Sequence, residues 1–122
     1  MATEQLKKDS ILLSIKHKLG LDEVDYFDQD IIIDINTALF KLTQIGVGPK
    51  NGFSIEDESQ TWNDFLGTNK NLEAVKSLVY LEVKLIFDPP TSGALMESCN
   101  KQIAELTWRL NVARENDTGG NL

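Results

Sequence analysis

Apolar side chains recur every three or four residues along most of this chain, which is the spacing that places them on one face of an α-helix. Gly20, Gly46 and the pair Pro89-Pro90 separate the periodic stretches, as helix breakers do. The pattern predicts helices over residues 5–19, 28–45, 61–66, 72–87 and from 91 or 92 to about 115.

The predicted 28–45 helix is apolar on more than one side. Its main stripe includes Ile31 and Ile35, whereas Ile33 and Phe40 lie one heptad apart on a separate flank. A helix with two apolar sides is either central in the fold or in contact with a second molecule.

Residues 46–60 do not follow helical spacing. They include three glycines and a proline, which exclude a regular helix. Phe53 and Ile55 alternate with Ser54, as in a short strand or an extended arm. The expected fold is therefore all-α, a compact bundle of about four to five helices with a short extended or β-hairpin arm around residues 46–60. One domain is expected over residues 1–115, followed by a flexible polar tail over residues 116–122.

The last predicted helix has two different sides. Met96, Ile103 and Leu110 recur every seven residues and form part of an apolar seam. The seam is short for a coiled coil, which favours packing within the chain. Trp108 lies off the seam, next to Arg109 and among charged positions. Because Trp and Arg are favoured anchors at interfaces, both are candidate contact residues. The alternative is an indole ring that lies against a loop of its own chain.

The net charge of the chain and its distribution limit the functions that the protein can have. The chain has 12 basic and 19 acidic residues and a net charge of −7. Six of the acids lie between Leu19 and Phe40, where there is no lysine or arginine. Sequence-specific DNA binding is not expected, because phosphate contacts come from Lys and Arg. This acidic block is either a solvated face, or a surface that repels nucleic acid or meets a basic partner.

The residues for catalysis or metal binding are scarce. His17 is the only histidine and Cys99 the only cysteine, whereas a structural zinc site needs about four such ligands. The glycine-rich stretch 46–52 matches neither phosphate-binding motif. We therefore expect no enzyme and predict no catalytic, cofactor-binding or metal residues. No apolar run approaches the roughly 18 residues of a membrane span, so no membrane association is expected.

Several linked segments between residues 10 and 113 resemble the small head–tail connector (adaptor) proteins of tailed bacteriophages. The most specific are Phe87-Asp88-Pro89-Pro90 and the run Leu106-Thr107-Trp108-Arg109-Leu110-Asn111. Residues 30–49, 52–55, 61–67 and 72–87 complete the resemblance.

The resemblance implies a structural protein of the virion neck, present in the host cytoplasm during assembly. It implies a homo-oligomeric ring, commonly a dodecamer, between the portal protein and a tail or neck completion protein, with DNA passing through without sequence-specific binding. The 46–60 arm becomes a candidate inter-subunit element, and the segment from Arg114 onward a candidate portal anchor. The candidate interface residues are Phe53, Ile55, Trp62, Trp108, Arg109 and Arg114.

A different class of function is also compatible with this composition. A small acidic protein can act as a monomeric regulator or inhibitor that binds one host or phage protein. The ring hypothesis uses the arm and the tail as contacts, whereas the inhibitor hypothesis needs a compact chain with one binding face. The state of assembly with the portal distinguishes the two.

Overall fold

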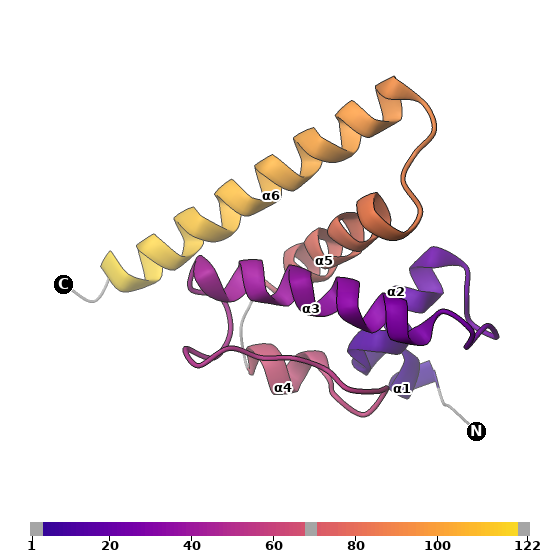
Figure 1. Ribbon diagram of the computed structural model, residues 1–122. Helices are drawn as coiled ribbons and strands as arrows, with labels where there is room; N and C mark the ends of the chain where they lie inside the picture. The colour runs from indigo at the N-terminus through magenta and orange to yellow at the C-terminus, as the bar shows by residue number, and fades with distance from the viewer. Residues whose placement is uncertain (1–3, 68–70, 120–122) are drawn as a thin grey trace.

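The computed structural model describes residues 4–67 and 71–119, with side chains for residues 7–67 and 71–113. The described residues contain helices and no strand, which confirms the all-α class. Along the chain follow α1 (Glu4–Asp9), α2 (Ile11–Leu19), α3 (Asp28–Gln44), α4 (Trp62–Leu66), α5 (Leu72–Phe87) and α6 (Gly93–Gly119) (Figure 1).

Helix α5 is the centre of the bundle. Helix α3 packs along one side of it, α2 packs on another, and α6 turns back across it after the Asp88-Pro89-Pro90 stop (Figure 1). Val75, Val79 and Val83 of α5 are fully buried. Isolated helices shorter than about 12–15 residues are only marginally stable in water. Packing against the shared core therefore stabilises the short helices α1, α2 and α4. The same buried cluster includes Ile11, Ile15, Ile31, Ile35, Leu39, Leu42 and Leu110.

The first predicted helix is in fact two helices, and the prediction of one continuous helix over residues 5–19 was wrong. Ser10 interrupts it with an extended backbone (φ −68°, ψ 130°), and its hydroxyl accepts a hydrogen bond from the Leu13 N–H at 3.1 Å. Ser10 is thus a helix N-cap, the position that serine favours. The Ile11 N–H donates to the Gln60 carbonyl at 3.1 Å, so the interruption fastens a remote segment to α2.

The 46–60 arm is irregular and extended, and it forms no hairpin. Val47 and Ile55 insert into the core and are 5% and 2% exposed. The Asn36 carboxamide of α3 bonds to the backbone of Ile55 in both directions. The arm therefore lies on its own domain along this part of its length.

Most predicted helix ends agree with the structure. Gly20 caps α2 with a left-handed backbone, and Thr61 forms a capping box with Asp64 at the start of α4. Helix α6 runs to Gly119, further than the predicted end near residue 115. Residues 120–122 lie outside the described residues, so a flexible tail stays a prediction. No helix in the described ranges is both long and apolar enough to cross a bilayer.

Candidate functional site

The outward side of α3 exposes large apolar side chains. Ile33 is 62% and Phe40 60% exposed. Seven helical residues separate them, which is two turns and about 10 Å along the axis on one side of the helix. Thr37 lies between them and bonds only to the carbonyl of Ile33 in its own helix. We call the following set the α3 outer face: Asp30, Ile33, Asp34, Thr37, Phe40 and Lys41.

Two acids flank Ile33 on the α3 outer face. Partial burial raises the pKa of Asp34, and the neighbouring carboxylate of Asp30 raises it further. Lys41 also lies on this face, but its amine bonds to Glu82 of α5 at 2.9 Å. The acidic end of the face therefore has no cation of the described chain to balance it.

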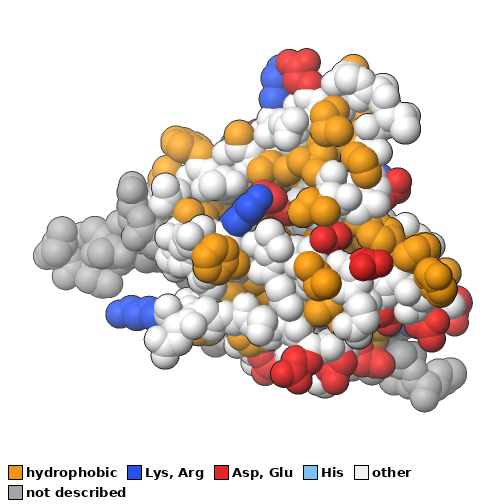
Figure 2. All heavy atoms as spheres, viewed as in Figure 1, with side chains coloured by type: hydrophobic (Ala, Val, Ile, Leu, Met, Phe, Trp, Pro, Cys, Tyr) orange, Lys and Arg blue, Asp and Glu red, His pale blue; other side chains and the backbone are white. Residues whose placement is uncertain are grey.

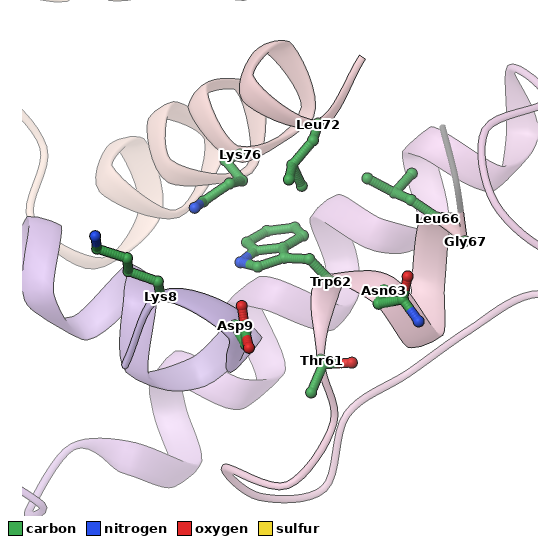
Figure 3. A pocket seen from close by; sticks show the side chains of 9 residues that line it. All are labelled: Lys8, Asp9, Thr61, Trp62, Asn63, Leu66, Gly67, Leu72 and Lys76. Atoms are coloured by element: carbon green, nitrogen blue, oxygen red, sulfur yellow. The ribbon is translucent and has the colours of Figure 1, made fainter. Parts of the chain in front are cut away.

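A pocket of about 450 Å³ lies among α1, α4 and α5 (Figure 3). The indole of Trp62 lies in its middle and donates from Nε1 to the Ser14 hydroxyl at 2.8 Å. Leu66 and Leu72 lie toward one side of the indole, and the amines of Lys8 and Lys76 lie toward the other. We call this the α1–α5 pocket. Its remaining lining residues are Asp9, Thr61, Asn63 and Gly67.

The two lysines give the pocket a basic edge in an acidic chain. Half of the described lysine and arginine side chains pair with acids inside the molecule: Lys16 pairs with Asp28 at 2.8 Å, and four others have acidic partners. Neither Lys8 nor Lys76 forms an ion pair with a described side chain. An apolar floor with unpaired amines suits an occupant that has both apolar and acidic groups.

A second hollow, of about 360 Å³, is strongly acidic. Asp22, Asp25 and Asp28 of the predicted acidic block line it. The last part of the arm adds Glu56, Asp57 and Glu58, and hydrogen bonds from Ser59 lower the pKa of Asp57. Acidic side chains gather along the lower edge of the molecule in Figure 2. The sequence did not predict that these two acidic segments, some 30 residues apart, form one surface.

The candidate interface residues of the arm point into their own chain. Phe53 is half-buried, and its ring lies 5.3 Å from that of Phe65. Ile55 and Trp62 are both 2% exposed. These three side chains therefore stabilise the fold of their own chain, and their contact with a neighbouring subunit stays a prediction.

The candidate interface residues Trp108 and Arg109 lie on the solvent-exposed side of α6, as predicted. Trp108 is 63% exposed, which confirms its outward orientation, and Arg109 bonds to Glu105 at 2.9 Å on the same solvated side. Leu110 of the seam is 2% exposed, so the seam packs within the chain at this point. The side chain of Arg114 lies outside the described residues.

The residues that could have carried chemistry lie apart. His17 is exposed and its Nδ1 lies 3.0 Å from Asp22, whereas Cys99 is half-buried on α6. Among the described residues, no group of three or more His, Cys, Asp or Glu side chains could hold a metal ion.

Comparison with known protein families identifies the family of this chain. The family model for the phage connector protein matches residues 11–117, which is most of the chain. The chain belongs to the phage connector protein family. The resemblance expected from the sequence is thus confirmed, and the connector is a structural protein and not an enzyme. No curated protein and no solved structure matches the connector at a significant level.

The surfaces of the connector were only partly foreseeable from its sequence. The heptad pair Ile33 and Phe40 signalled a second apolar side of α3, and the outward Trp108 followed from its charged neighbours. The α1–α5 pocket carries no sequence signal. Lys8 and Lys76 come from helices far apart in the chain, and only the packing of α1 beside α5 brings them together.

Proposed function

We propose that this connector is an adaptor of the virion neck, which assembles as an oligomeric ring between the portal protein and the tail or neck proteins. The match over residues 11–117 is the observation that carries the proposal. Large exposed apolar side chains are available for such contacts: Tyr26, Ile33, Phe40, Ile86, Leu95 and Trp108 are 52–85% exposed.

The charge distribution supports passage of DNA without binding. The acidic hollow and the exposed acids of the 21–30 segment repel phosphate groups. A conduit should not hold the DNA that passes through it. In this proposal the acidic surface faces the channel, or lies near it.

The tail and the outer side of α6 are the proposed contacts with other neck components. The segment from Arg114 to residue 122, which begins in the last turns of α6, would dock on the portal. Trp108 and Arg109 present an exposed aromatic ring and a guanidinium side by side, the two groups most often found as interface anchors. The 46–60 arm would contribute to contacts between subunits through its exposed residues.

The test is to mix the purified connector with its cognate portal and to weigh the products by mass photometry. The proposal predicts that the portal gains several copies of the 13.7 kDa chain and that negative-stain images show a second ring of uniform diameter. A connector that remains monomeric with portal and capsid, or that binds one copy of a non-virion protein, would contradict the proposal. The latter result would favour the small acidic regulator.

A further inference from the structure

We propose that the α3 outer face of one connector docks on the α1–α5 pocket of the next copy, so that subunits join front to back. The occupant of the pocket is thus a second copy of this chain. This inference rests on the proposed ring and names the two surfaces that would close it.

The two surfaces lie on opposite sides of α5. Leu78 and Glu82 border a groove that α3 also lines, whereas Leu72 and Lys76 line the α1–α5 pocket. Leu78 is two residues from Lys76, which places the two side chains about 160° apart around the helix. The outer face of α3 points away from α5, since Ile31, Ile35 and Leu39 occupy its inner side.

A contact between two different surfaces of one chain is heterologous. Such a contact leaves a free front and a free back on every pair of copies, so that further copies add until the ring closes. A contact of one surface with itself would stop at a dimer. Surfaces on opposite sides of the molecule are therefore the arrangement that ring assembly requires.

Charge favours this pairing. Two chains with a net charge of −7 repel one another, so a stable contact needs a positive surface on one of them. The α1–α5 pocket offers Lys8 and Lys76, and the α3 outer face offers Asp30 and Asp34; none of the four forms an ion pair with a side chain that the structure describes. Each surface also has one residue whose charge is opposite to that of the pair. Asp9 lines the pocket and Lys41 lies on the face, where Glu82 holds it at 2.9 Å.

The apolar groups have a corresponding arrangement. In the pocket, two leucines lie to one side of the Trp62 indole and two amines to the other (Figure 3). On α3, exposed Ile33 lies next to the two carboxylates, and exposed Phe40 lies two turns further along the same side. In the proposed contact, the carboxylates of the α3 outer face meet the amines of the pocket. The apolar side chains of the face meet the leucines and the indole of the pocket. Such complementarity fixes the register of a contact and disfavours other pairings.

Disulfide cross-linking tests the contact directly. In a Cys99→Ser background, Ile33→Cys and Leu72→Cys are combined in one chain and oxidised after assembly on the portal. A front-to-back contact predicts a ladder of covalent dimers, trimers and larger species. Each single-cysteine variant is the control and should give no ladder. Rings that assemble on the portal without a ladder would overturn this inference and leave the proposed function standing, whereas failure of the unmodified chain to assemble on the portal would overturn both.

Charge reversal gives an independent readout that does not need cysteine. Lys8→Glu with Lys76→Glu, and separately Asp30→Lys with Asp34→Lys, should each lower ring yield at least about tenfold, since like charges across a contact are strongly unfavourable. Mixing the two variants, or combining all four changes, should restore assembly to within about twofold, because opposite charges then face one another again. Lys18→Glu reverses a charge in the same direction as the lysine changes, outside both surfaces and outside the arm, and is the control for them. Equal losses in test and control variants, with no rescue, would contradict the assigned surfaces.

Discussion

Asn36 of α3 holds the backbone of Ile55 through two hydrogen bonds. Its Nδ2 donates to the Ile55 carbonyl at 3.1 Å, and its Oδ1 accepts from the Ile55 N–H at 2.8 Å. The Asn36 side chain thus forms the two backbone hydrogen bonds with Ile55 that a neighbouring β-strand would form in a sheet. The arm can remain irregular because its buried backbone groups are satisfied in this way.

Asn36→Ala should therefore destabilise the fold more than its partial burial suggests. It leaves a donor and an acceptor of Ile55 without partners, which costs about 1–3 kcal/mol. Urea unfolding followed by circular dichroism measures the change. Thr37→Ala is the matched control, because the Thr37 hydroxyl bonds only within its own helix and alanine favours helix. Equal destabilisation by the two changes would show that the Asn36 bonds are not needed.

Gly48 and Gly52 form a second matched pair. Both have positive φ, +86° and +91°, which an L side chain adopts at a cost of about 1–2 kcal/mol. A Cβ on Gly48 would lie 2.3 Å from the Phe65 ring, whereas nothing lies within 4 Å of one on Gly52. Gly48→Ala should therefore cost at least about 1 kcal/mol more than Gly52→Ala, because buried Phe65 must move. Thermal melts of the two variants compare them, and similar melting temperatures would contradict the close packing of Gly48.

The two tryptophans should separate stability from assembly. Trp62 is 2% exposed, so Trp62→Ala should cost about 3–5 kcal/mol. Trp108 is 63% exposed, so Trp108→Ala should change stability by about 0.5 kcal/mol or less and still lower incorporation of the connector into particles. Melting curves and particle composition supply the two measurements. A large fall in melting temperature for Trp108→Ala, or normal incorporation, would remove Trp108 from the contact residues.

Asp34 gives a pH-dependent prediction. Its pKa is raised in the folded chain by burial and then by Asp30, so the folded state binds more protons than the unfolded state as this group titrates. Stability should therefore fall as pH rises from the unfolded value, about 3.9, through the raised folded value. Asp34→Asn should stabilise the isolated chain at pH 7 by up to about 0.5 kcal/mol, and the gain should vanish near pH 3.

The same substitution should weaken assembly, because it removes a charge from the α3 outer face. Chemical denaturation at the two pH values and ring yield on the portal are the paired measurements. Glu23→Gln is the control, as it removes an exposed acid of the same block outside that face. A variant that gained stability and also assembled normally would show that Asp34 takes no part in the contact.

Periodicity and chain-breaking residues predicted the helical fold, because several helix ends are set by local signals. Gly20, the capping box at Thr61, and Pro89-Pro90 are such signals, and they act where the sequence places them. Ser10 was missed for a physical reason. It interrupts an otherwise favourable helix because the backbone beside it bonds to residues 60 and 61, and that contact is tertiary.

The surfaces were predictable only where one helix carries them. The outward positions of Ile33 and Phe40 follow from spacing alone. The buried state of Ile55 does not, because an alternating apolar pattern at residues 53–55 gives no information on which neighbour covers it. The α1–α5 pocket and the acidic hollow each join segments that only the packed core brings together.

Cryo-electron microscopy of the virion neck tests the central claim most directly. The account predicts a ring of connector copies next to the portal, in which the α5–α6 hairpin fits the density of each subunit. It also predicts that α3 of one subunit faces α1 and α5 of its neighbour. A neck whose rings leave no density for this chain would contradict the assignment of the connector to the head–tail junction.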